Sequence, residues 1–123
     1  MTIIIYEYYA INVNTYKINP HIESLINYYI PPVTKLEVMA NLFYIFSDKT
    51  RLKIMFSLTI SELCVGDISI TTAINRTTVS HQLTILKKEG LVNSKNDGKL
   101  KVYYISNPIL IDILKLGSKW LDN

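Results

Sequence analysis

The chain has little of what membrane proteins and disulfide-stabilised proteins require. Its 123 residues include one cysteine, which excludes a disulfide within the chain. No apolar run approaches the roughly 20 residues that a membrane-spanning helix needs. The stretch MTIIIYEYYAINVN lacks the basic start of a secretory signal and is interrupted by Glu7. We therefore expect a cytoplasmic protein with no membrane partner.

Few residues are available for catalysis. The chain has two histidines and four glycines, and no glycine-rich phosphate loop or recognisable pair of catalytic carboxylates. Ser80 and His81 are adjacent, and neighbouring residues on a helix point about 100° apart, so they cannot pair as nucleophile and base. We predict that the protein is not an enzyme and has no cofactor.

Positive charge is concentrated in one segment. The formal net charge is only +3, yet residues 76–101 carry six basic side chains against Glu89 and Asp97. The remainder carries seven basic and eight acidic side chains. A surface that binds a polyanion would have this distribution, although a solvated charged face is the more ordinary explanation of charge alone.

Apolar periodicity predicts three helices before this segment. Asn19 can cap the first helix and Pro20 can occupy its first turn. A second helix is predicted over about residues 34–46, and a third follows it directly. The 49% hydrophobic content is sufficient for the core of one domain.

Residues 65–88 have the pattern of a helix-turn-helix. Helical patterns over residues 65–72 and 76–88 flank a short connection, and Asn75 can cap the second helix. That helix has an apolar back and a polar front, which suits a helix that lies in the major groove of DNA. The back consists of Val79, Leu83 and Leu86, and the front of Thr77, His81, Thr84 and Lys88.

A basic hairpin follows. Asp97-Gly98 is a strong signal for a two-residue turn between extended stretches. Because side chains alternate along a strand, we expect one face to pack and the other to present cations. The packed face would be Leu100, Val102 and Tyr104, and the cationic face Lys99, Lys101 and Tyr103. This is the pattern of a wing, although lysines that protect a sheet edge from aggregation would resemble it.

Four stretches, FSDKTRLKIMFSL, ELCVGDI, TTVSHQLTILKKEGLV and GKLKVYY, together resemble the ArsR/SmtB family of winged-helix repressors. The resemblance covers about residues 36–120. It implies a homodimeric transcriptional repressor, bacterial or archaeal, that leaves its operator when an effector, often a metal ion, binds. The predicted fold class is α+β and mostly helical, a winged helix-turn-helix with a two-stranded β-hairpin wing. Residues 1–31 would form an N-terminal extension with a short helix, and residues 32–123 the DNA-binding and dimerisation domain.

The sequence departs from the family pattern in the helix-turn-helix and the wing. Lys49 replaces the usual proline of the first motif, and the wing is one residue longer. Ala73 stands where the turn often has glycine, and Thr72 where an aliphatic residue is usual. Because alanine tolerates a positive φ poorly, the turn is expected to have unusual backbone geometry.

We predict sequence-specific binding to double-stranded DNA through the second helix of the helix-turn-helix, residues 76–88, and through the wing. Thr77, Ser80, His81 and Thr84 are expected to face the bases, with Arg76 and Gln82 near the groove edges. Thr78 is also expected to belong to the DNA-binding surface. Lys87, Lys95, Lys99 and Lys101 are expected to touch phosphates. The alternative is a winged-helix module whose basic surface binds an acidic protein partner.

The last helix is predicted to form part of a homodimer interface. Asn107 can cap it and Pro108 fits its first turn. Its apolar face is too wide for a small monomer to cover. The face consists of Ile109, Leu110, Ile113, Leu114, Gly117, Trp120 and Leu121. The family resemblance implies that the first core helix contributes to the same interface.

Cys64 lies three residues before Asp67, so a thiol and a carboxylate are one helical turn apart. Relatives in the resembled family place metals either at this cysteine, with ligands from the amino-terminal arm, or between paired final helices. The final helix here has no histidine, and the arm offers only His21 and Glu23. A zinc site needs four good ligands, and a soft metal needs more than one thiolate. We therefore predict no metal site and expect Cys64 to be an ordinary small buried residue.

Overall fold

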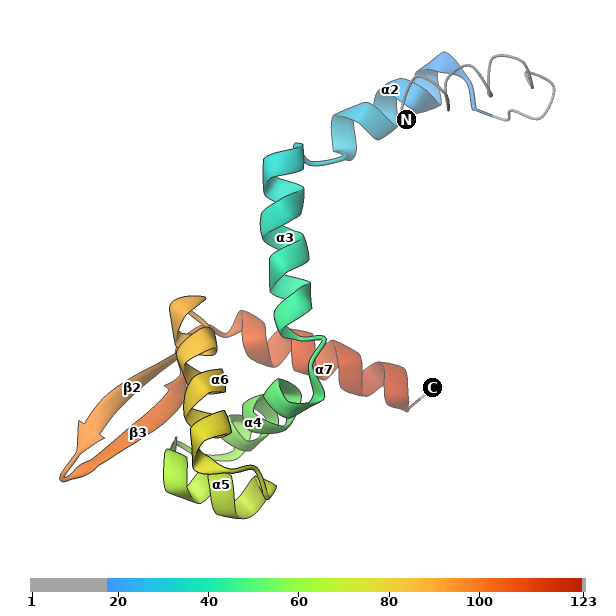
Figure 1. Cartoon of the computed structure of the whole chain (residues 1–123). Coiled ribbons are helices and arrows are strands. Elements are labelled where there is room, and N and C mark those ends of the chain that lie inside the picture. The colour runs from blue at the N-terminus through green and yellow to red at the C-terminus, as the bar shows by residue number, and fades with distance from the viewer. Residues whose placement is uncertain (1–17, 123) are drawn as a thin grey trace. The chain divides into compact units, whose positions relative to one another are not determined.

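The computed structural model describes residues 18–122 (Figure 1). The chain divides into two compact units, Met1–Met39 and Ala40–Asn123. Within the described residues, no helix combines the length and the apolar character needed to cross a membrane. The elements in chain order are α2 (Pro20–Tyr29), α3 (Val33–Ile45), α4 (Lys49–Ile60), β1 (Leu63–Cys64), α5 (Val65–Thr72), α6 (Arg76–Lys88), β2 (Val92–Asp97), β3 (Leu100–Ile105) and α7 (Ile109–Leu121).

Helix α2, in the first unit, begins and ends where its sequence signals predict. The Asn19 side chain accepts a hydrogen bond of 3.0 Å from the backbone N–H of Ile22, and Pro20 occupies the first turn. Pro lacks the N–H that a first-turn residue would leave unpaired, so it fits there without cost. Ile30 is already extended and ends the helix, so the predicted short helix is confirmed.

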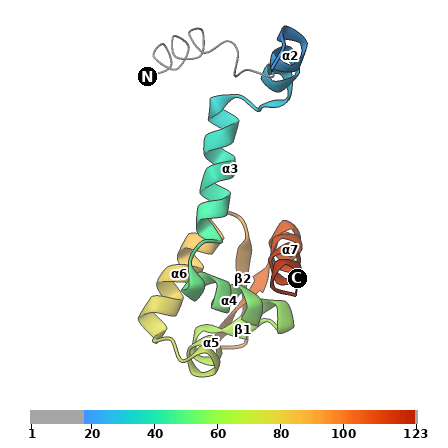
Figure 2. The ribbon, with the colours of Figure 1, turned by 90° about the vertical axis from the view of Figure 1, so that its right-hand side faces the viewer.

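The second unit has a hydrophobic core built mainly from α4, α5, α6 and α7. Asp48 caps α4 by accepting a 2.8 Å hydrogen bond from the backbone N–H of Arg51. Figure 2 shows α4 between α6 and α7. The largest fully buried side chains of the core are Ile54, Met55, Ile68, Val79, Leu83, Leu86, Leu91, Val92 and Leu110.

The wing belongs to a three-stranded antiparallel sheet of order β1-β3-β2. The hairpin of β2 and β3 extends away from the helices (Figure 1). Two strands were predicted, and the structure adds β1, in which Leu63 pairs with Tyr103 and Cys64 with Val102. A two-residue strand has no periodicity of its own, since only its pairing with β3 defines it. Strand β1 attaches the base of the wing to the start of the helix-turn-helix.

Candidate nucleic-acid interface

The turn between α5 and α6 has the unusual geometry predicted for it. Ala73 adopts a left-handed conformation with φ 58° and ψ 32°, and no other non-glycine within residues 18–122 has a positive φ. This conformation costs an alanine about 1–2 kcal/mol. Hydrogen bonds hold the preceding residue, because the buried Thr72 hydroxyl donates to the Ile68 carbonyl at 2.5 Å. The Thr72 carbonyl in turn accepts from Lys53 Nζ at 2.9 Å.

Helix α6 has the two faces that its sequence predicts. Asn75 caps it by accepting a 2.8 Å hydrogen bond from the backbone N–H of Thr78. Val79, Leu83 and Leu86 are fully buried and anchor the helix to the core. The polar residues predicted to face bases all lie on the exposed side: Thr77, Ser80, His81 and Thr84. The Thr84 hydroxyl donates to the Ser80 carbonyl at 2.9 Å, so on the outside of the helix it offers chiefly an acceptor.

The residues predicted near the groove edges differ in their surroundings. Arg76 is exposed, and its guanidinium lies over Gly66 of α5, where an added Cβ would be only 2.9 Å from Nη2. A glycine at that position therefore makes room for this arginine conformation. Thr78 and Gln82 are half-buried, and Gln82 Oε1 accepts a 3.1 Å hydrogen bond from Arg51 Nη1.

The wing packs by the opposite alternation to the one predicted. Tyr103 is buried and belongs to the core, whereas Leu100 near the tip is exposed. Leu63, the partner of Tyr103 in β1, and Ile105 on the same strand face also pack against the core, so this face turns toward the helices at the base of the hairpin. Lys101 lies two residues nearer the tip on the same face, with Nζ 5.7 Å from the Tyr103 ring centroid. One strand face therefore packs at the base and presents a cation farther out.

The predicted phosphate-contacting lysines are not equivalent. Lys99 and Lys101 are exposed at and beside the tip of the hairpin. Lys87 is exposed but donates a 2.8 Å hydrogen bond to Ser94 of β2, which connects the end of α6 to the wing. Such a contact orients the ammonium group, which has no ion-pair partner among the described residues 18–122.

Lys95 has an acidic partner. Its Nζ lies 2.9 Å from Glu62 Oε2, and both side chains are about half exposed. The hydrogen bond to Glu62, together with the charge of that carboxylate, raises the pKa of Lys95 above its ordinary value of 10.5. Any stability that this shift provides is present below that value and is lost only as the pH rises through the raised pKa. Lys95 is therefore fully charged at neutral pH, but part of its charge is balanced by Glu62.

Arg51 is a buried residue that contacts this surface from behind, and the sequence analysis missed it. Only 8% of it is exposed, and it hydrogen-bonds to Gln82 of the recognition helix α6. A signal was present, because Arg51 shares the helical stripe of Ile54, Met55 and Leu58, all of which are buried. A basic residue in register with a buried stripe indicates a charge that the fold must pair.

Cys64, predicted to be an ordinary small buried residue, is half-buried. Its thiol donates a 3.1 Å hydrogen bond to Asp67 Oδ2 across the start of α5. Within residues 18–122, no group of three or more His, Cys, Asp and Glu side chains could hold a metal ion. Two donors with one thiolate do not satisfy zinc or a soft metal.

Comparisons with known proteins agree with this geometry. Residues 48–94 match the family described as bacterial regulatory protein, arsR family. The cadmium resistance transcriptional regulatory protein CadC of Listeria innocua is 39% identical over 102 residues, which cover 82% of this chain and 81% of CadC. The arsenical resistance operon repressor of Staphylococcus aureus is 31% identical over 77 residues, which cover 63% of this chain and 74% of that repressor.

A solved structure extends the similarity to the fold. The homodimeric winged helix-turn-helix DNA-binding domain from Mycobacterium bovis superimposes with a TM-score of 0.66 at 28% identity, covering 72% of this chain and 82% of that domain. The matched region includes the helix-turn-helix described above, which the family model spans in full. The chain therefore belongs to the arsR family of bacterial regulatory proteins and is a DNA-binding transcriptional repressor, not an enzyme.

Proposed function

We propose that the protein binds its operator as a homodimer, with α6 of each protomer in a major groove and each wing against the neighbouring phosphates. The exposed polar side of α6, with its fully buried back, is the observation that carries this proposal. Thr77, Ser80, His81 and Thr84 would read base edges, with Arg76 and Thr78 at the groove edge. A two-fold dimer of this kind selects an inverted repeat.

The basic wing supplies affinity that does not depend on sequence. Lys99 and Lys101 carry charge without an acidic partner among residues 18–122. Lys87 stands at the end of α6, where a phosphate would also meet the base of the wing. Phosphate contacts of this kind position the protein, whereas base contacts select the sequence.

Replacement of His81 or Thr77 with Ala tests the reading of bases. The probes are an operator duplex, selected by the full-length protein from a randomised pool, and a random duplex of equal length. Each variant should lose about 1–3 kcal/mol of discrimination between the two duplexes while its unfolding temperature stays unchanged, because both side chains are exposed. Equal losses on the two duplexes would overturn the assignment of base contacts to this face.

We further propose that the dimer forms through α3 and the outer side of α7. Leu110 and Leu114 of the predicted apolar face belong to the protomer's own core, so they are not available to a partner. Another side of α7, about 120° around the helix from Leu110 and Leu114, carries an apolar stripe that stays exposed: Ile109, Leu116 and Trp120. Along α3, the large exposed apolar side chains are Val33, Leu36, Val38, Met39, Phe43 and Tyr44.

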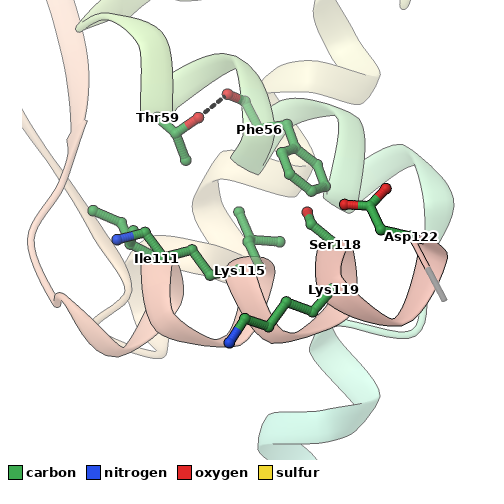
Figure 3. Close-up of a pocket in the computed structure, with 8 residues that line it drawn as sticks. Phe56, Thr59, Ile111, Lys115, Ser118, Lys119 and Asp122 are labelled. Carbon is green, nitrogen blue, oxygen red and sulfur yellow. Dashed lines mark hydrogen bonds between the residues drawn. The ribbon is translucent and has the colours of Figure 1, made fainter.

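A separate hollow lies between α4 and α7 (Figure 3). Phe56 and Thr59 of α4 line it, together with Ile111 and Leu114 of α7. The charged side chains Lys115, Lys119 and Asp122 lie along its α7 side. An apolar floor with a charged rim is typical of a protein contact surface.

We infer that the signal that releases the repressor from DNA is not a metal ion bound at Cys64. CadC is named for cadmium resistance, which makes cadmium the metal to test. The only metal-binding donors that the structure brings together at Cys64 are its own thiol and the Asp67 carboxylate, among residues 18–122. The presence of a cysteine at position 64 is instead explained by the half-buried packing of its side chain and by its hydrogen bond to Asp67.

A further inference from the structure

The buried guanidinium of Arg51 joins the end of α3 to the recognition helix. Arg51 and Thr72 are the buried polar side chains among residues 18–122. Burial of an unpaired charge costs several kcal/mol, so a buried guanidinium requires partners for its N–H groups. Hydrogen bonds and a ring contact supply these partners from two different helices.

The partners on α3 are the carbonyl oxygens that end the helix. Arg51 Nε donates to the Ile45 carbonyl at 2.8 Å, and Nη2 donates to the Tyr44 carbonyl at 3.4 Å. The last carbonyls of a helix have no partner within it and form the negative end of its dipole. The guanidinium satisfies the Ile45 carbonyl and adds a longer contact to the Tyr44 carbonyl, which also accepts from the Ser47 N–H at 3.0 Å and the Ser47 hydroxyl at 2.6 Å. Its Cζ lies 5.6 Å from the Tyr44 ring centroid.

The partner on α6 is the side chain of Gln82, whose Oε1 accepts from Arg51 Nη1 at 3.1 Å. A guanidinium can only donate, so the amide oxygen, not the amide nitrogen, must face it. The Gln82 NH2 group then points away from Arg51 with two donors. Gln82 lies beside His81 on the helix that reads DNA, and it is half-buried, so its amide end is held rather than free to rotate.

We propose that Arg51 is a positioning residue that fixes Gln82 as a hydrogen-bond donor toward DNA. Gln82 would then accept nothing from DNA and would require an acceptor there, either a phosphate oxygen or an acceptor atom on a base edge. Because the same guanidinium also hydrogen-bonds to the end of α3, it fixes the position of α6 relative to the end of that helix. This inference rests on the proposed placement of α6 in the major groove.

A double-mutant cycle tests the coupling. Gln82→Met keeps the length of the side chain but removes the amide, and Arg51→Lys keeps the charge but cannot reach the carbonyls and Gln82 together. Dissociation constants are measured for the selected operator duplex and for a random duplex, at a temperature where circular dichroism shows each variant folded. Each single variant should bind operator about five- to tenfold more weakly, and the double variant no more weakly than Arg51→Lys alone.

The random duplex identifies the acceptor. Loss on operator alone would identify a base edge, whereas equal loss on both duplexes would identify a phosphate; each supports the proposal. Losses that multiply in the double variant would show that Arg51 affects DNA binding independently of Gln82, and unchanged binding by Gln82→Met would remove Gln82 from the interface. Either result overturns the inference.

Two further variants keep the outcome interpretable. Gln82→Glu preserves an acceptor for Arg51 and replaces the donors, so its unfolding temperature should hold while operator affinity falls; if Arg51→Lys does not fold, retained affinity in Gln82→Glu overturns the proposal. His81→Ala reports on the recognition helix itself. If His81→Ala lowers discrimination and Gln82→Met changes nothing, the inference alone fails, whereas unchanged discrimination in both variants would reject the proposed groove contact.

Discussion

Replacement of Trp120 with Ala should split the dimer. Trp120 lies on the outer side of α7 with 77% of its surface exposed in the protomer. Burial of roughly 100 Å² of each indole at about 25 cal/mol per Å² contributes about 2.5 kcal/mol per protomer. Both copies contribute in a two-fold dimer, so the change should cost about 5 kcal/mol and raise the dimer dissociation constant about 10³–10⁴-fold.

Sedimentation equilibrium over a range of micromolar concentrations measures this dissociation constant directly. The matched control is Ile70→Ala, because Ile70 is 79% exposed on α5, outside the proposed interface, and should leave the dimer intact. Leu114→Ala lies on α7 but in the core, so it should instead lower the free energy of unfolding by about 2–5 kcal/mol. An unchanged dissociation constant in the Trp120 variant would refute the outer side of α7 as the interface.

Three further experiments test the wing, the turn between α5 and α6, and the absence of a metal site at Cys64. Replacement of Lys99 and Lys101 together with Ala should weaken operator and random duplexes alike and reduce the slope of log affinity against log salt by about 2; an unchanged slope in fluorescence anisotropy would show that the wing does not reach phosphates. Ala73→Gly should raise the free energy of unfolding by up to about 1 kcal/mol, because the left-handed geometry costs alanine more than glycine loses in entropy; a lower urea midpoint would contradict this. Cadmium or zinc should leave operator binding unchanged in both the parent and Cys64→Ser, and metal-driven release in the parent alone would establish Cys64 as a ligand.

The elements that were predicted correctly are those whose ends are determined by residues close together in the sequence. Asn19 and Asn75 cap α2 and α6 as expected, because capping depends on residues three positions apart. The reversal after α6 coincides with Gly90, whose φ is 73°. Strand β1 was missed because a two-residue strand is defined only by its pairing with β3, about forty residues later in the chain.

Periodicity could not divide the two sides of α7 correctly. The predicted face combined Leu110 and Leu114, which are buried, with Trp120, which is exposed, and omitted Leu116. A helix that packs on its own core and also binds a partner is apolar around much of its circumference. The sequence pattern therefore identifies such a helix but does not show which of its sides faces the core. The position of α4 determines which stripe is internal, and that information is not local.

Charge counting had a similar limit at the wing. Six basic residues in residues 76–101 were compatible with a polyanion-binding surface, but Glu62 lies outside that segment and is brought to Lys95 by the pairing of β1 with β3. A phosphate near Lys95 must compete with a carboxylate 2.9 Å away, so Lys95 gains little by contacting DNA. Lys99 and Lys101 have no such acidic partner within residues 18–122. The wing's contribution to affinity should therefore come from its tip and not from its base.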